Sequence, residues 1–234
     1  GHRKEAAVKL IKDNGPLVFG VQEAIHSQMR YLDKYLPEYK FIGVGRDDGE
    51  EAGEYSAVFY HESLTLLNEG TFWLSETPNE VSKAWDAALP RICTYGQFKI
   101  GESTFWIFNT HFDHRGVQAR EESAKMIVQK IQEITEEDDT VILTGDFNST
   151  SDKAPYAAIT SYMLDGAKES QTRPEGPIGT FSGFDLKAEL NDRIDYIFFR
   201  NAQVSGYSHL DTKRPNGLWV SDHLPVLMKV KIQD

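Results

Sequence analysis

The sequence predicts an α/β protein in which sheets are stacked in layers and helices lie outside them. Strand-like segments outnumber helical ones, and several follow one another directly along the chain, which favours layered sheets over one wound parallel sheet. The chain has 234 residues, 40% of them hydrophobic, and this suffices for a sizeable core. Because no repeat or linker-like stretch divides it, we expect one domain over residues 1–234.

Amphipathic spacing and terminating residues define the expected helices. At the start of the chain, Ala6, Ala7, Leu10 and Ile11 recur at helical spacing before Gly15. A later segment carries one apolar stripe between charged faces, as a surface helix does. The expected helices are residues 3–14, 25–36, 117–135 and, shorter, 155–163.

Short runs rich in β-branched and aromatic residues define the expected strands. They are residues 17–23, 55–61, 63–74, 91–100, 103–112, 140–148, 193–200 and 223–232. The single cysteine, Cys93, falls within one of them; it excludes an internal disulfide and is typical of a small core residue.

The charge composition limits the partners of the protein. Lys and Arg total 25 against 36 Asp and Glu, so the net charge is -11 and the molecule repels polyanions at long range. Strong binding of duplex nucleic acid is therefore not expected, whereas a small phosphate ester held by a metal is compatible. No apolar run approaches the ~20 residues of a membrane helix and no signal peptide is recognisable, so no membrane span is expected and the compartment stays open.

Polar residues stand at or near the ends of several predicted strands. A carboxylate beside a buried strand must be hydrated, paired or bound to a cation. One such residue would indicate a turn, whereas several indicate the walls of one site. They are Glu23; Asn109, His111 and Asp113; Asp146 and Asn148; Asp195; and Asp222 and His223.

These side chains have the chemistry of a magnesium-assisted phosphate site. Mg²⁺ takes one or two carboxylates and leaves positions for water and phosphate oxygens. While the strand persists, Asp146 and Asn148 place a carboxylate and an amide donor on the same side. A phosphoryl transition state mostly needs placement and charge neutralisation, which a metal, two histidines and an amide can supply.

Five motifs, in order, resemble the magnesium-dependent endonuclease/exonuclease/phosphatase superfamily, which includes deoxyribonuclease I. They are "GVQEA", "NTHFDH", "TGDFNS", "RIDYIF" and "SDHLPV", and the resemblance spans residues 17–227. It implies a four-layer α/β/β/α sandwich, in which two mostly antiparallel sheets pack face to face with helices outside. It also implies a site at one end of the sheets and Mg²⁺ or Mn²⁺ as the cofactor.

The resemblance assigns the metal and the attacking water to three positions. Glu23 of "QE" would be the metal ligand, and Asp222 of "SDH" would lie near the metal. Asp146 of "GDFN" would position or deprotonate the water. Which group is the general base stays open.

The remaining roles implied by the resemblance concern the phosphate. Asn148 would bind a phosphate oxygen, and His111 of "NTH" would be the second imidazole at the phosphate. Asp195 would orient His223. Arg91 of "PRICT" falls where several relatives place a phosphate-contacting arginine, so it is a candidate for substrate binding.

One departure concerns the first strand of the superfamily, which carries a metal-contacting Asn in a motif like "FNIR". This chain starts after that point, and neither Asn14 nor any earlier residue replaces it. We expect that an N-terminal segment was cleaved, omitted or disordered. The departure bears on metal occupancy and activity more than on the fold.

Each candidate also has a purely structural interpretation. Asp146 and Asn148 can form an Asx-turn, and His223 can be a core histidine bonded to the neighbouring acid. Glu23 can cap the helix that follows it, and Arg91 can merely pair with a surface acid. The coincidence of five ordered motifs favours the site for all of these positions except Arg91, for which the two interpretations are nearly balanced.

Several other segments carry weaker signals. Residues 46–54 predict a solvated loop with Glu54 as a minor site candidate, and residues 70–93 are a hypothesised substrate-selecting loop that includes Glu76 and Trp85. For the tryptophans at 73, 85 and 219, packing is favoured over stacking on a substrate. Histidines without motif context are expected at the surface: His2, His26, His61 and His209.

The function that these observations predict is a divalent-metal-dependent phosphoesterase, which hydrolyses a phosphomonoester or phosphodiester by attack of an activated water. The expected partner is a phosphorylated small molecule or a short single-stranded nucleic acid, bound by a monomer. Two alternatives stay open. One is a nuclease of the 3'-5' exonuclease or deadenylase type, and the other is a non-catalytic binding module on the same scaffold.

Overall fold

The computed structural model describes residues 3–232. Its helices are α1 (Arg3–Asn14), α2 (His26–Tyr35), α3 (Val117–Ile134), α4 (Ala154–Thr160) and α5 (Gly166–Glu169). Its strands are β1 (Val18–Ile25), β2 (Tyr39–Ile42), β3 (Glu54–His61), β4 (Thr65–Trp73), β5 (Ile92–Ile100), β6 (Ser103–His111), β7 (Val141–Asp146), β8 (Leu164–Asp165), β9 (Asp195–Arg200), β10 (Ala202–His209) and β11 (Val226–Ile232).

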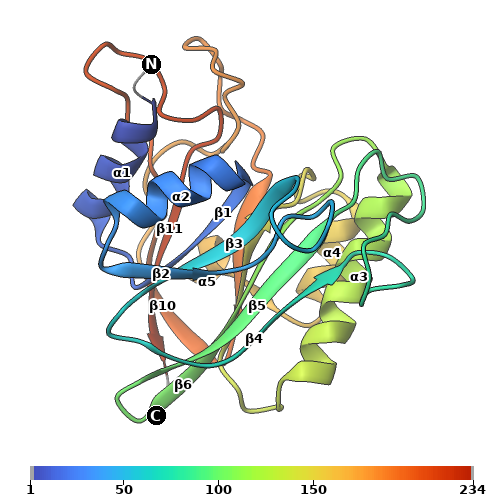
Figure 1. Cartoon of the computed structure of the whole chain (residues 1–234). Coiled ribbons are helices and arrows are strands. Elements are labelled where there is room, and N and C mark those ends of the chain that lie inside the picture. Colours follow the sequence, from blue (N-terminus) through green and yellow to red (C-terminus); the bar gives the residue numbers. More distant parts are fainter. Residues whose placement is uncertain (1–2, 233–234) are drawn as a thin grey trace.

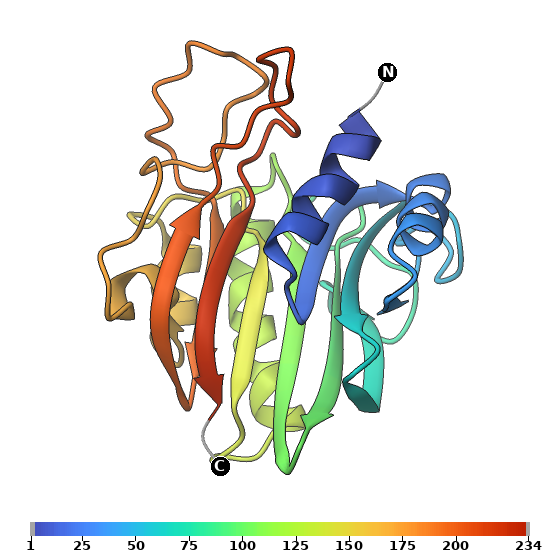
Figure 2. The ribbon, with the colours of Figure 1, turned by 90° about the vertical axis from the view of Figure 1, so that its left-hand side faces the viewer.

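The elements form four layers, which confirms the predicted α/β/β/α sandwich. Helices α1 and α2 lie on one side of the sheets and α3 and α4 on the other (Figure 1). The long connections 170–194 and 210–225 both project from one end of the sheets (Figure 2). No helix within residues 3–232 is both long and apolar enough to cross a membrane.

Two inner layers of strands pack against each other. One is a six-stranded sheet in the order β4-β5-β6-β7-β9-β8, and β6 and β7 are its one parallel pair. The other layer contains the three-stranded sheet β1-β3-β2 and the antiparallel pair β10-β11. The strands are thus mostly antiparallel, as the sequence predicts.

Alternation along β6 explains how one strand serves two cores. Phe105 and Ile107 point into the cluster between the two sheets, whereas Trp106 and Phe108 point into the cluster under α3 and α4. Successive side chains of a strand face opposite sides, so a strand covered on both faces is apolar throughout. A third cluster, around Met29, fills the space between the three-stranded sheet and helices α1 and α2.

Asn109 joins the two sheets by hydrogen bonds. It is fully buried, and its Nδ2 donates to Val21 O over 3.0 Å and to Ala57 O over 2.9 Å. Its Oδ1 accepts from Gln22 Nε2 over 2.7 Å and from Thr144 Oγ1 over 2.9 Å. All four bonding positions of the amide are therefore satisfied, so this strand-end residue is structural.

Several element boundaries differ from the prediction for local reasons. The strand expected at 223–232 begins only at Val226, because Pro225 has no N–H to donate to a ladder. The strand expected at 140–148 ends at Asp146, because Asn148 has a left-handed backbone. The unpredicted β10 contains a register shift between Val204 and Gly206, which interrupts its alternation.

The cysteine and the histidines to which the sequence assigns no site role differ in how exposed their side chains are. Cys93 is fully buried, which confirms its expected place in the core. The surface prediction is wrong for His209, which is 6% exposed with its Nδ1 2.7 Å from Pro177 O. His26 and His61 are partly exposed, and His2 lies outside the described residues.

Candidate active site

Three candidate residues form a row across adjacent strands of the six-stranded sheet. His111 ends β6, Asp146 ends β7 and Asp195 begins β9. His111 is in register with Asp146, and Asp146 with Asp195. Because paired strands lie about 4.8 Å apart, the register alone brings these three buried side chains to one end of the sheet.

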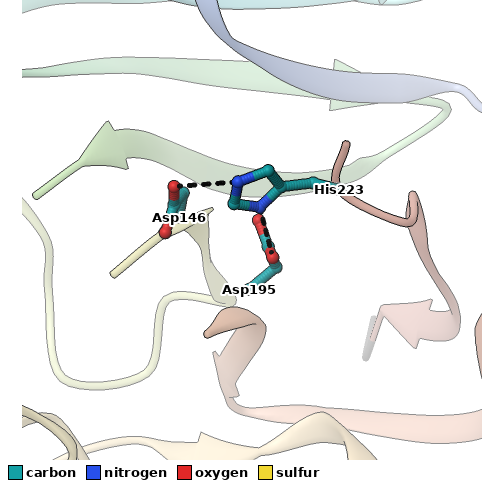
Figure 3. A group of neighbouring side chains, drawn as sticks. All are labelled: Asp146, Asp195 and His223. Carbon is teal, nitrogen blue, oxygen red and sulfur yellow. Dashed lines mark hydrogen bonds and ion pairs between the residues drawn. The ribbon is translucent and has the colours of Figure 1, made fainter. Parts of the chain in front are cut away.

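His223 faces this row from the connection before β11. Its Nδ1 lies 2.9 Å from Asp195 Oδ2, and its Nε2 lies 3.8 Å from Asp146 Oδ2 (Figure 3). Burial alone would lower the pKa of His223, but the hydrogen bond and charge of Asp195 raise it to about 9. His223 is therefore an imidazolium at neutral pH, which donates one N–H to Asp195 and directs the other toward Asp146.

Asp146 lies between the two imidazoles. Burial and then the charge of Asp195 raise the pKa of Asp146 to about 7. Its Oδ2 lies 3.4 Å from His111 Nε2, and its Oδ1 accepts the backbone N–H of Asn148 over 2.8 Å. A carboxyl with this pKa can exchange a proton at neutral pH.

Asn148 reaches the row through the turn that ends β7. Its φ is 45°, in the left-handed region that Asn tolerates better than most residues. Its Nδ2 donates to Phe112 O over 3.0 Å and lies 3.1 Å from His111 Nε2. The Asx-turn that the sequence offers as a structural alternative thus exists, and it brings the amide to the site.

Arg91 lies behind His111 and is only 4% exposed. Its Nη1 donates to His111 Nδ1 over 3.0 Å, its Nη2 donates to His114 Nδ1 over 3.0 Å, and its Nε lies 3.4 Å from Asp113 Oδ2. A guanidinium has no acceptor, so His111 Nδ1 must be the acceptor and the ring proton must be on Nε2. Burial and then the charges of Arg91 and Arg46 hold the pKa of His111 well below its ordinary value.

Glu23 approaches the row from the opposite sheet. It lies at a β-bulge of β1 with φ 60°, and its Oε1 lies 3.9 Å from His111 Nε2. A positive φ is uncommon for Glu, and such conformations concentrate at functional sites. Partial burial and then the charges of Glu54 and Asp222 raise the pKa of Glu23, whose side chain stays 56% exposed.

The donor set fits a hard divalent cation. The negative charges of Glu54 and Asp222 contribute to the raised pKa of Glu23, and a cation bound here would offset this repulsion. Asp146, Asp195 and His223 form a second group whose ligand atoms lie within 4.8 Å of one another. Its imidazole is already bonded to Asp195 and suits Mg²⁺ less well than carboxylates do.

A cleft of about 450 Å³ opens beside Asn148. The start of α3, residues 148–155, and the segment that includes Phe181 and Ile194 form its walls. The ring of Phe181 packs against that of His223, with centroids 5.0 Å apart. The cleft therefore adjoins the row of candidate residues.

The hypothesised substrate-selecting loop, residues 70–93, contributes no side chain to this cleft. Instead it is braced against the end of β6 and the start of α3. Asp86 accepts the N–H of Ala119 over 2.7 Å, and Asp113 accepts those of Ala88 and Leu89. The tryptophans at 73 and 219 are buried, as packing residues are, and the one at 85 is partly buried.

Arg46 is a residue that the sequence does not identify. Most of the acidic residues from Asp47 to Glu51 are exposed, as predicted, but the Arg46 side chain is 8% exposed and its Nη1 lies 2.6 Å from Glu54 Oε2. The only sequence signal for its burial is the apolar run that precedes it at 41–44. Its charge contributes to the lowered pKa of His111.

A two-sheet sandwich of this kind defines the chain as a protein of the deoxyribonuclease I-like class. Carboxylates, imidazoles and an amide gather at the ends of its strands. The chain belongs to the endonuclease/exonuclease/phosphatase family, whose model matches residues 1–223. Members of this family are hydrolytic and generally depend on a divalent metal.

Several known proteins resemble the chain along its length. A mannosyl-6-phosphatase from Bacteroides thetaiotaomicron is 37% identical, with a TM-score of 0.94 over 99% of this chain and 91% of that one. TDP2 of D. rerio, solved with a single-strand DNA product, is 19% identical with a TM-score of 0.78 over 98% of this chain and 91% of that one, and shows the fold alone. An uncharacterised protein of Acanthamoeba polyphaga mimivirus is 28% identical over 97% of this chain and 90% of that protein.

Proposed function

We propose that this protein is a divalent-metal-dependent phosphoesterase that hydrolyses a small phosphorylated substrate by attack of water. The observation that carries the proposal is the convergence of the His111, Asp146 and Asp195 row with His223. A phosphatase that is 37% identical to the chain supports a phosphomonoester as the substrate. The net charge of -11 favours a small ester over a nucleic-acid strand.

The metal would be held by Glu23 and Asp222; after burial and the charge of Glu54, the charge of Asp222 also contributes to the raised pKa of Glu23. The chemistry that Mg²⁺ or Mn²⁺ supplies when bound is polarisation of the phosphoryl group and neutralisation of its charge. Proton transfer and phosphate placement fall to the neighbouring side chains.

Phosphate placement falls to His111 and Asn148. Because Arg91 occupies Nδ1 of His111, the Nε2–H of this ring is a donor, and it lies beside the Nδ2 donor of Asn148. Two adjacent donors, beside a carboxylate that lies 3.4 Å from the Nε2, are suited to a phosphoryl oxygen. Arg91 is buried with contacts to Asp113, His111 and His114, so we assign it a positioning role through His111 rather than direct contact with the substrate.

Proton transfer falls to Asp146 and His223. Asp146 positions the water and accepts its proton, since its carboxyl has a pKa of about 7. His223, whose pKa is about 9 because of Asp195, carries a proton that it can donate to the developing negative charge. General acid–base groups of this kind each contribute about 10²- to 10⁴-fold in rate.

The test is hydrolysis of a panel of phosphate monoesters and diesters in Mg²⁺ or Mn²⁺, including a hexose 6-phosphate and a single-stranded oligonucleotide. Asp146→Ala and His223→Ala should each lose two to four orders of magnitude in rate, roughly, with an unchanged circular dichroism spectrum. The control is Asp211→Asn, which neutralises an exposed carboxylate. Near-wild-type hydrolysis by either alanine variant would reject the proposed roles.

Two results distinguish a phosphoesterase from a non-catalytic binding module on the same scaffold. The binding module predicts that no ester is hydrolysed in either metal. Calorimetric titration with Mg²⁺ then shows whether the protein binds the ion, with Glu23→Gln as the variant that should weaken binding.

A further inference from the structure

The cleft beside Asn148 is not explained by phosphate binding or proton transfer. At about 450 Å³ it is near the lower end of the volumes of small-molecule sites, which is the size range for one or two rings. It shares Asn148 with the candidate phosphate site, and its Phe181 packs on His223. An ester whose phosphate lies at His111 and Asn148 would therefore extend its organic group into this cleft.

The charges that line the cleft cancel. Arg120 and Lys153 are its cations, and Glu121 and Asp192 are its anions. Arg120 Nη1 already donates to a backbone carbonyl, and Lys153 already pairs with Asp152 at 2.8 Å. A balanced, partly satisfied lining does not select a second phosphate, which needs unpaired cations.

Apolar surface and a hydroxyl acceptor lie together in the cleft. Phe181 and Val117 are 42% and 66% exposed, which leaves an aromatic face and an aliphatic edge open to a ligand. Within residues 3–232 no group donates a hydrogen bond to the Asp192 carboxylate, so its oxygens can accept from a ligand hydroxyl. Small-molecule sites combine apolar walls with a few such polar groups.

We propose that this cleft is the subsite for the organic group of the ester and takes an uncharged, hydroxyl-rich ring, so that the substrate is a sugar phosphate. Phe181 packs against the C–H face of the ring, and Asp192 accepts from its hydroxyls. This assignment rests on the proposed phosphoesterase function. A nucleoside monophosphate is the competing occupant; its organic group is also uncharged and bears hydroxyls, so a kinetic comparison decides between the two.

The kinetic test compares a substrate that fills the cleft with one that does not. We measure kcat/KM for glucose 6-phosphate, mannose 6-phosphate, a nucleoside monophosphate (AMP) and methyl phosphate in Mg²⁺, using wild type, Phe181→Ala and Asp192→Asn. Each variant should lower kcat/KM for the hexose phosphates about tenfold relative to methyl phosphate, the size expected for losing one pocket contact. Phe184→Ala is the matched control, because Phe184 is 45% exposed, close to the 42% of Phe181, but lies outside the cleft.

A second measurement does not depend on hydrolysis. Saturation-transfer NMR with methyl α-glucoside and methyl α-mannoside should show ring protons in contact with the wild-type protein and a weaker effect for Phe181→Ala. If no ester is hydrolysed, the proposed function fails while this experiment still decides the subsite. The proposal would be overturned if the ratio of kcat/KM for hexose 6-phosphate to that for methyl phosphate were equal in Phe181→Ala and Phe184→Ala. A preference of the wild-type protein for nucleoside monophosphates would also overturn it.

Discussion

Replacing Asp195 by Asn should change the proton affinity of His223 more than any other property of the protein. The two side chains are 2.9 Å apart, and Asp195 contributes most, ahead of Asp146 and Asp222, to raising the pKa of His223 from 6.5 to about 9. The substitution would keep the shape of the side chain and remove its charge. The pKa of His223 should then fall by roughly two or more, because burial, which lowers it, is no longer opposed by this partner.

The same difference sets the expected loss of stability. The interval between 6.5 and about 9 corresponds to about 3 kcal/mol of interaction that only the charged imidazole makes. Because the folded-state pKa is raised, this stabilisation is complete below pH 6.5 and disappears as the pH rises through about 9. The gap in unfolding free energy between wild type and Asp195→Asn should therefore be largest near pH 6 and narrow above pH 8.

The assay is an NMR titration of the His223 ring in metal-free buffer, with His223→Gln to assign the signal, beside urea unfolding at a series of pH values. The control is Asp211→Asn, which should shift neither quantity. A wild-type His223 that titrates near 6.5, or one that still titrates near 9 in Asp195→Asn, would refute the reasoning.

Four further outcomes are expected. Arg91→Met should lower the unfolding free energy by roughly 3 kcal/mol in urea titrations, because it leaves buried Asp113 without its cation; a loss below 1 kcal/mol would contradict the pairing. Asn109→Leu should cost a few kcal/mol, since it leaves backbone carbonyls of the opposite sheet without donors, and a neutral effect would show that water replaces the amide. Gly20→Ala should cost about 1–3 kcal/mol, because its Cβ would lie 2.3 Å from Asn109 Oδ1; an unchanged melting temperature would exclude this close packing. Burial raises the pKa of Cys93, so native protein should resist thiol reagents until urea unfolds it, whereas rapid labelling would mean that this strand opens locally.

The residues that the sequence identifies best are those whose position follows from strand pairing. His111, Asp146 and Asp195 each end or begin a strand, so once the strands pair in register the three must meet. Stacked sheets with helices outside follow similarly from consecutive strands that are apolar on both faces, whereas the four-layer order is what the family resemblance implies. In these cases the local sequence pattern is enough to predict which side chains meet, because the pairing of the strands determines their positions.

The residues that the sequence does not identify depend on contacts between distant segments. Arg46 lies between a short apolar run and an acidic run, and this local pattern does not predict that it pairs with Glu54 in the interior. The bulge in β10 interrupts the alternation of inward and outward side chains. The sequence pattern therefore does not predict that His209 is buried against Pro177. The motif around Arg91 predicts a contact with the phosphate. In the structure Arg91 instead donates to His111 Nδ1, the ring nitrogen that does not face Asp146.

The amide that bonds both sheets has a mechanical consequence for the site. Glu23 belongs to one sheet and His111 and Asp146 to the other, so any sliding between the layers would separate Glu23 from these two residues. Asn109 lies two residues before His111 and holds Val21, two residues before Glu23, at hydrogen-bonding distance. Sliding of the layers would stretch these bonds, so the spacing between the two sides of the candidate site is constrained by the interior of the protein.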